Sequence, residues 1–180
     1  MHFIETKRLY LRGLDDQDTE GPYFQWMNDG EVTRFLEARF FPQSRSALKS
    51  FIQSMSDGRN LLLGICLKSD NRHIGNIKLG PINTIHRHAD LGLLIGDKSE
   101  WGKGYACEAI KALTDYAFSH LNLIKVSAGI YSTNIGSIKT FEKAGFVHEG
   151  QLKNQFFSEG EWIDHCLVAK FRSDAIPSTK

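Results

Sequence analysis

The amino-acid sequence predicts a mixed α/β fold of the α+β kind, in which helices flank a mostly antiparallel sheet. Hydrophobic residues alternate with period two in several short segments and recur at helical spacing in others. Two apolar runs separated by the turn residues 69–71 predict an antiparallel hairpin. Later in the chain, strand and helix patterns alternate, which predicts at least one βαβ crossover. We therefore expect one twisted sheet of about seven strands flanked by about four helices.

The N-terminal half contains a strand, two helices and the hairpin. Leu9 and Leu11 alternate with polar side chains, which predicts a strand over residues 6–14. Acidic residues crowd the following segment, as is typical of a helix N-terminus, and an aromatic cluster continues it. A second helix should begin after Ser44 or Ser46 and end before Gly58, because apolar residues recur there at helical spacing. The hairpin strands are expected at 60–67 and 73–79.

The C-terminal half contains the predicted crossover and a second hairpin. The expected elements are a strand at 86–95, an amphipathic helix at 105–121, a strand at 123–131, a helix at 134–144 and strands at 147–157 and 162–171. No repeat or linker interrupts this order. We therefore predict a single domain over residues 1–172 and a C-terminal tail over 173–180.

The composition is that of an ordinary soluble domain and excludes several classes of protein. Hydrophobic residues make up 41% and charged residues 24% of the 180, which excludes a disordered, collagenous or coiled-coil chain. The formal net charge of +1 provides no field that would attract nucleic acid or an anionic membrane, so neither is expected as a partner. The 3 cysteines lack metal-ligand spacing, and no apolar run has the length of a signal or membrane segment. We therefore expect a cytoplasmic protein.

A glycine turn lies between a predicted strand and a predicted helix. Its sequence is Trp101-Gly102-Lys103-Gly104-Tyr105-Ala106. Two glycines allow a tight turn with exposed backbone N–H groups, and the helix start adds partial positive charge, so the turn suits a pyrophosphate. A plain strand-to-helix turn would use the same residues. The pattern is neither a Walker loop nor a Rossmann fingerprint, because it lacks their lysine-hydroxyl pair and third glycine.

A second motif follows the glycine turn and changes its interpretation. Asn134-Ile135-Gly136-Ser137 and Phe141-Glu142-Lys143-Ala144-Gly145-Phe146 stand about thirty residues beyond the turn. In this order and spacing, the two motifs resemble the GNAT N-acetyltransferase superfamily. The chain looks closest to its RimJ/RimL-type branch and is also similar to spermidine and amino-sugar acetyltransferases. The resemblance covers nearly the whole chain.

The resemblance implies a reaction and a set of cofactor contacts. Acetyl-CoA would be the cosubstrate, and a primary amine would attack it directly in a ternary complex, without a metal. The acceptor would be a protein N-terminus, an amino sugar or another small amine, and a homodimer is compatible with the resemblance. The implied cofactor contacts are Leu93, Leu94, Ile95, Trp101, Gly102, Lys103, Gly104, Tyr105, Ala106, Asn134, Ser137 and Phe141. Trp101 departs from the Arg or Gln of the family pattern, and Asn134 would also serve as a helix N-cap.

Three polar residues on the strand before the glycine turn are candidates for the chemistry. His86, His88 and Asp90 are spaced so that they share one face of a strand. Asp90 is the first candidate for the base or the amine anchor, and His88 is an alternative base. The same face would also fit an ordinary solvated strand, and the His-x-His-x-Asp pattern could supply metal ligands.

The general acid of the family is in doubt here, because Phe141 stands where the resemblance implies a tyrosine. Tyr131 or Ser137 could replace it, or solvent could protonate the thiolate. The candidate acceptor contacts are Phe35, Glu37 and His86, since a carboxylate among aromatic rings suits an amine. The missing tyrosine leaves open an alternative function, a CoA-binding sensor or interaction domain without catalysis.

Overall fold

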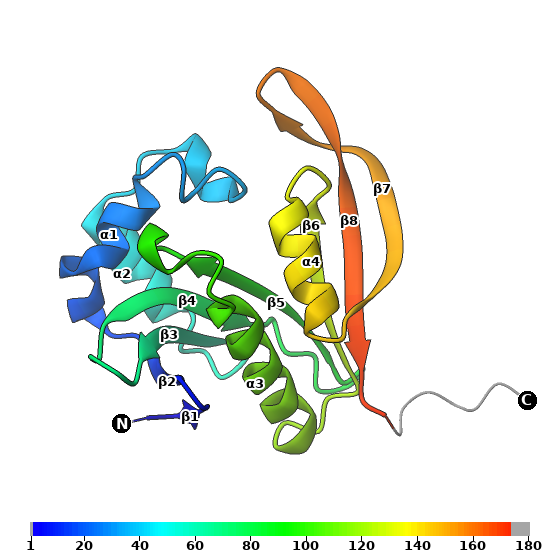
Figure 1. The fold of residues 1–180 in the computed structure, drawn as a ribbon, viewed down its shortest axis with the longest axis horizontal. Helices are drawn as coiled ribbons and strands as arrows, with labels where there is room; N and C mark the ends of the chain where they lie inside the picture. The colour runs from blue at the N-terminus through cyan, green and yellow to red at the C-terminus, as the bar shows by residue number, and fades with distance from the viewer. Residues whose placement is uncertain (1, 174–180) are drawn as a thin grey trace, which may run out of the picture.

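The computed structural model describes residues 2–173, and these form one eight-stranded sheet with helices on both faces (Figure 1). The strands are β1 (Ile4–Glu5), β2 (Leu9–Gly13), β3 (Leu61–Leu67), β4 (His73–Leu79), β5 (His88–Ile95), β6 (Lys125–Tyr131), β7 (Val147–Ser158) and β8 (Glu161–Phe171). Their order is β1-β2-β3-β4-β5-β6-β8-β7. Within the described residues, β5 and β6 pair in parallel and every other neighbouring pair is antiparallel. The predicted mixed, mostly antiparallel sheet is confirmed, with the two-residue β1 as an additional strand.

Four α-helices accompany the sheet in the described part of the chain. They are α1 (Pro22–Met27), α2 (Arg45–Ser54), α3 (Tyr105–Ser119) and α4 (Ile135–Lys143), joined by the 3-10 turns η1 (Asp16–Glu20), η2 (Glu37–Phe40) and η3 (Lys98–Glu100). The side chain of Ser44 caps α2 by accepting a hydrogen bond from the Ala47 N–H at 3.1 Å, as predicted. The first predicted helix divides at Gly21 into η1 and α1, because Pro22 offers no N–H to continue the helical ladder.

The strand alternation sends hydrophobic side chains to both faces of the sheet. Odd-numbered residues of β3 and β5, such as Leu63 and Leu93, pack in a core with α3 and α4. Even-numbered residues, such as Leu62 and Leu94, pack in a second cluster with Trp26 of α1 and with α2. Because a strand alternates with period two, one strand serves both cores. Figure 1 shows α3 and α4 in front of the sheet, and α1 and α2 at the left, near β3 and β4.

The start of β5 differs from the prediction. The strand begins at His88, and His86 lies in the preceding turn, because Arg87 has a left-handed backbone with φ 57°. His86 therefore does not belong to the strand alternation. Its ring still lies near that of His88, with the two ring centroids 6.4 Å apart.

The two halves of the sheet part between β5 and β6. The parallel pairing covers His88↔Lys125, Ala89↔Val126 and Asp90↔Ser127 and then stops. Beyond it, β5 continues beside β4 alone, and β6 continues beside β8 alone. The result is a wedge with its closed end at Asp90. Figure 1 shows β5 and β6 running apart.

A bulge shapes the β7–β8 hairpin. Leu152 and Phe156 of β7 pair with His165 and Ile163 of β8, so three residues on β7 face one on β8. That one residue, Asp164, accepts hydrogen bonds from the Asn154 N–H at 2.9 Å and the Lys153 ammonium at 2.8 Å. The bulge ends the ordinary register and brings Phe156 against Tyr131, with ring centroids 4.0 Å apart.

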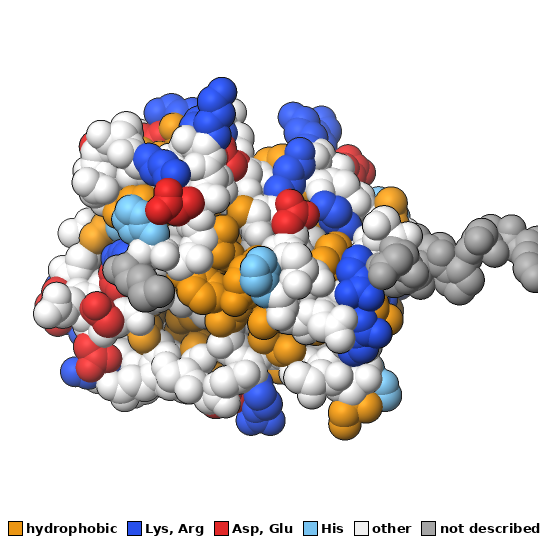
Figure 2. Space-filling view, turned by 90° about the horizontal axis from the view of Figure 1, so that it is seen from below, with side chains coloured by type: hydrophobic (Ala, Val, Ile, Leu, Met, Phe, Trp, Pro, Cys, Tyr) orange, Lys and Arg blue, Asp and Glu red, His pale blue; other side chains and the backbone are white. Residues whose placement is uncertain are grey.

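The surface matches the near-neutral composition. Figure 2 shows basic and acidic side chains around a hydrophobic patch on the face seen from below. Among the described residues, no helix is long and apolar enough to cross a membrane. Of the predicted tail, residues 174–180 lie outside the described part of the chain.

Candidate active site

The glycine turn forms the N-terminus of α3. Gly102 and Gly104 are both left-handed, with φ 75° and 82°, and α3 begins at the next residue, Tyr105. A Cβ added at Gly102 would meet no atom within 4 Å, so the turn has open space above it. A 15-residue helix presents unpaired N–H groups at this end, which is the donor set that a phosphate requires.

A buried carboxylate holds the turn in place from below. Glu100 is 5% exposed and accepts hydrogen bonds from Lys103 at 2.9 Å and from Arg72 at 2.8 Å. These two cations lower the pKa of Glu100, the Lys103 ammonium most strongly. Arg72 also pairs with Asp97, the residue that caps η3. Lys103, a predicted phosphate contact, is therefore part of this brace.

Arg8 of the N-terminal segment holds the turn from the other side. Its guanidinium donates hydrogen bonds to the Lys103 carbonyl at 2.9 Å and to Glu108 of α3 at 2.6 Å, and it stacks over the Tyr105 ring at 4.3 Å. The sequence analysis missed Arg8, because nearly a hundred residues separate it from its partners. It adds a positive charge at the edge of the turn.

The backbone groups along the open edge of β5 belong to its odd-numbered residues. The Asp90 carbonyl accepts from the Gly80 N–H on the β4 side, so alternation directs the backbone groups of Leu93 and Ile95 into the wedge. The prediction that the backbone of Leu94 contacts the cofactor is corrected here. Its backbone groups face β4, and its side chain packs against α1 and α2. The Trp101 indole donates a 2.7 Å hydrogen bond to the Ile95 carbonyl, which ties the glycine turn to the end of the strand.

The start of α4 lies just beyond β6. The Asn134 side chain accepts a hydrogen bond from the Ser137 N–H at 3.2 Å and caps the helix, as predicted. The Phe141 ring is 2% exposed and packs edge-on against Phe146 at 5.0 Å. The structure thus gives Phe141 a packing role, and contacts of these three residues with a cofactor stay predictions.

Asp90 marks the closed end of the wedge. It is exposed, and its carboxylate accepts a hydrogen bond from the Ser127 hydroxyl of β6. His88 shares its face of β5, whereas His86 lies outside the strand. Within residues 2–173, no group of three His, Cys, Asp or Glu side chains is placed to hold a metal ion, so the metal interpretation of this pattern gains no support.

A second cluster lines the β6 side of the wedge. It brings Tyr131, predicted as a candidate acid, together with Phe35 and Glu37, predicted as acceptor contacts. The Tyr131 hydroxyl donates a short hydrogen bond to Glu37 of η2, and the Arg39 guanidinium lies 5.2 Å from the Tyr131 ring centre. The Phe35 ring completes the cluster, 6.1 Å from that of Tyr131. Burial and the Glu37 carboxylate raise the pKa of Tyr131 to about 12, so the phenol keeps its proton at neutral pH.

His165 of β8 belongs to the same cluster and was missed in the sequence. Its ring lies 4.7 Å from that of Phe156, and burial lowers the pKa of its imidazole. A Cβ added at Gly129 would lie 1.9 Å from Nε2 of His165, so the ring covers the backbone of β6 at that glycine. The sequence contained one signal for this contact, since a glycine within a strand often marks a place where another group approaches the backbone closely.

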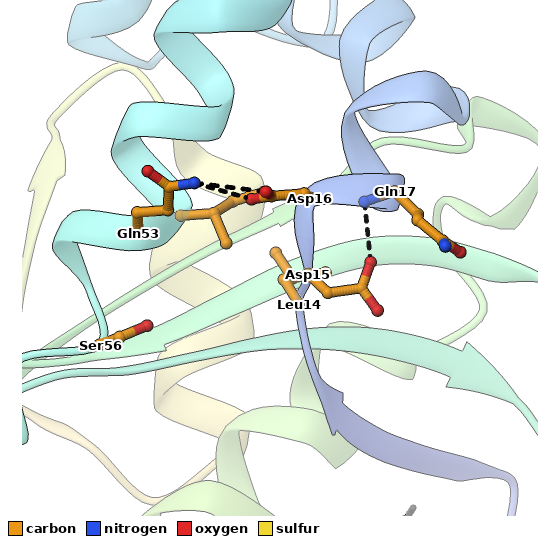
Figure 3. Close-up of a pocket in the computed structure, with 7 residues that line it drawn as sticks. Leu14, Asp15, Asp16, Gln17, Gln53 and Ser56 are labelled. Atoms are coloured by element: carbon orange, nitrogen blue, oxygen red, sulfur yellow. Dashed lines mark hydrogen bonds between the residues drawn. The ribbon is translucent and has the colours of Figure 1, made fainter.

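Two hollows lie outside the wedge itself. One of about 250 Å³ adjoins the Tyr131 cluster and is lined by Arg34, Phe35, Thr133, Ser158, Glu159, Glu161 and Ile163. The other, of about 520 Å³, lies between η1 and α2 (Figure 3). None of the predicted site residues lines this second hollow. Of its two carboxylates, Asp16 is paired with Lys49 and Gln53, and Asp15 accepts the Gln17 N–H.

The fold that contains these parted strands and the glycine turn superposes on that of a solved N-acetyltransferase. The family model described as an acetyltransferase (GNAT) domain matches residues 8–147, which is more than half of the chain. The chain therefore belongs to the GNAT acetyltransferases. It is an N-acetyltransferase.

Three relatives place the chain within this family. A probable N-acetyltransferase of Bacillus subtilis, YjcK, is 33% identical over 182 residues, covering 95% of this chain and 98% of that protein. The spermidine N(1)-acetyltransferase of Vibrio cholerae is 37% identical over 91 residues, covering 51% of this chain and 52% of that protein. The crystal structure of a V. cholerae spermidine N-acetyltransferase with CoA and spermine superposes with a TM-score of 0.85 at 26% identity, covering 94% of this chain and 99% of that one.

Proposed function

We propose that this protein transfers the acetyl group of acetyl-CoA to a small primary amine held in the wedge between β5 and β6. The observation that carries the proposal is that these strands part after Asp90, beside the glycine turn that starts α3. A pyrophosphate site and an extended slot are thereby adjacent. When bound there, acetyl-CoA supplies the thioester.

The residues of the turn and of β5 fit the two polar parts of such a ligand. The N–H groups from Gly102 to Ala106 would receive the pyrophosphate, with Arg8 at the edge of the turn. The backbone groups of Leu93 and Ile95 would pair with the amide-bearing arm, as an added strand does. Because the space above the turn is open, no rearrangement of the backbone is required.

The acceptor amine would lie on the other side of the wedge, at the Tyr131 cluster. The Glu37 carboxylate, which is held by Tyr131, would attract the ammonium group, and the Phe35 ring would contact the body of the acceptor. Glu161 lines the adjoining hollow and favours a cationic molecule, whereas Glu159 there is already paired with Arg34. The spermidine acetyltransferases among the relatives support a small amine. Asp90 would anchor the amine from the closed end, with His88 beside it.

The test is release of CoA thiol from acetyl-CoA in the presence of spermidine, an amino sugar or a peptide with a free N-terminus. We expect the highest rate with the small amines, whereas a preference for the peptide would instead favour the RimJ/RimL-type branch. Glu37→Gln should raise the KM for the amine and leave acetyl-CoA affinity unchanged, because Glu37 lies on the acceptor side.

Glu31→Gln is the matched control, since Glu31 is exposed and pairs with Lys98. Tight binding of acetyl-CoA without thiol release on any acceptor would contradict the proposal and revive a non-catalytic role. The comparisons with known proteins offer no support for that role.

A further inference from the structure

We propose that the imidazole of His165 accepts the proton that the acceptor ammonium loses before its nitrogen attacks the acetyl group. The inference rests on the proposed function, and it assigns the base to β8 rather than to the β5 residues Asp90 and His88. Three features of the structure support it: the position of the His165 ring, the groups around that ring, and the placement of the alternative bases Asp90 and His88.

The ring of His165 lies on a wall of the wedge. Its Cα is opposite Tyr131 in the β6–β8 register, but Nε2 lies over Gly129, two residues nearer the closed end. Pairing with β5 ends at Ser127, so Gly129 already belongs to the open part of β6. The imidazole therefore reaches from β8 over the strand that borders the slot.

The ring is also free to accept a proton. Among the described residues, neither of its nitrogens has a hydrogen-bond partner. Its ring packs against Phe156 of β7, which stacks on Tyr131 of β6. The charged groups of the facing segment, Glu37 and Arg39, contact Tyr131. Burial without a carboxylate partner lowers the pKa of His165, so the imidazole is neutral at pH 7.

The candidates on β5 are less well placed. Asp90 stands at the closed end, where its carboxylate already accepts the Ser127 hydroxyl. His88 is two residues further back, beside the ring of His86 and within the paired part of the strands. Asp90 can anchor the amine from the closed end, but neither residue borders the open part of the wedge, along which the thioester would extend.

The step balances as follows. One N–H proton of the ammonium passes to Nε2 of His165, which becomes an imidazolium. The freed nitrogen lone pair forms the C–N bond to the acetyl carbon, the C–S bond breaks, and its electron pair leaves on the sulfur as a thiolate. The second nitrogen proton goes to this thiolate through solvent, and the imidazolium returns its proton to water.

The experiment compares three variants of the full chain under saturating acetyl-CoA. His165→Gln should lower kcat/KM by about 10²–10⁴ at pH 7. Gly129→Ala should lower it in the same direction, because the new Cβ would occupy the position of the imidazole, a movable side chain. The double variant should lose no more than His165→Gln alone, since both changes remove one interaction. His148→Gln, an exposed position on β7, is the control.

The pH profile separates a proton acceptor from a structural residue. The wild-type rate should be level above the His165 pKa, whereas the His165→Gln rate should rise about tenfold per pH unit until the amine loses its own proton. Acetyl-CoA affinity should stay within about twofold, because the cofactor contacts lie elsewhere. A pH-independent loss, or no loss, would overturn the inference while leaving the proposed function intact.

A second measurement needs no acceptor. The ¹⁵N resonances of the His165 ring should titrate below the ordinary histidine range and move when CoA is added, since Nε2 borders the slot. Unchanged resonances with saturating CoA would overturn the inference. If CoA itself did not bind, the proposed function would fail first, and the two failures are thereby distinguished.

Discussion

Gly104 shows how one residue determines whether a phosphate can approach the start of α3. Its φ of 82° is left-handed, and a Cβ there would lie 3.6 Å from the Arg8 guanidinium. Left-handed backbone costs a residue with a Cβ roughly 1–2 kcal/mol, and a β-branched side chain more. We predict that Gly104→Val lowers acetyl-CoA affinity by about tenfold or more, measured by calorimetry.

The control for this substitution has the same backbone strain in another place. Gly58, after α2, has φ 76° and open space around it. Gly58→Val should therefore lower stability without changing acetyl-CoA affinity. Equal affinity losses in both variants would show that strain, and not the glycine turn, decides binding.

Asp90 offers a second prediction at the scale of the residue. As an anchor at the closed end of the wedge, it should position the amine without accepting its proton. Asp90→Asn should lower the acetylation rate by about ten- to a hundredfold, the cost of a misplaced reactant, equally at every pH. Ser127→Ala, which removes the hydroxyl that holds Asp90, should have a smaller effect of the same kind. A loss that disappears as pH approaches the amine pKa would make Asp90 the base.

The segment from η3 to α3 works as one element because Arg72 and Arg8 hold it from two sides. Arg72 joins Asp97 and the buried Glu100, and without it Glu100 keeps Lys103 as its cation. Arg72→Ala should speed amide hydrogen exchange over residues 97–104 and weaken acetyl-CoA binding by about three- to tenfold, because the turn is less preorganised.

The same measurement contains its own reference points. Exchange in the middle of α3, where Ile110 and Leu113 are fully buried, should not change. Arg59→Ala removes an exposed arginine paired with Asp57, far from the turn, and should leave both readouts at the wild-type level. Uniformly faster exchange over the whole chain would show global destabilisation instead of a local brace.

At the scale of the whole molecule, two partly buried histidines, His73 and His165, make stability depend on pH. Nε2 of His73 donates to the Gly75 backbone carbonyl and to the side-chain oxygen Oδ1 of Asn76, and its ring lies against Trp26. Burial lowers the pKa of His73 more than the neighbouring Asp18 raises it, and burial also lowers the pKa of His165. Folding therefore favours the neutral rings.

The sign of this linkage gives the fourth prediction. Unfolding restores the ordinary histidine pKa near 6.5, so the unfolded chain binds protons first as the pH falls. The free energy of unfolding, measured in urea, should decline as pH falls from about 7 to 5, before carboxylates titrate. His73→Gln should reduce the slope, whereas the exposed His120→Gln should not. An unchanged slope in His73→Gln would contradict it.

Local patterns in the sequence were sufficient for the elements and for the glycine turn. Period two and helical period located β2 to β8 and α2 to α4, and Ser44 and Asn134 were identified as caps. These features depend on residues close together in the chain, so short-range sterics and hydrogen bonding determine them. Arg87 was the exception, since its left-handed backbone moved His86 out of β5.

Only the tertiary structure decided which side chains meet at the wedge. Tyr131 and Glu37 are 94 positions apart, and Arg8 and Lys103 are 95 apart. Strand order and the β7 bulge bring His165 and Phe156 beside Tyr131, and neither leaves a periodic signal in the sequence. The sequence by itself thus determined the acetyltransferase framework, whereas the acceptor side of the site arises from long-range packing, which local patterns do not encode.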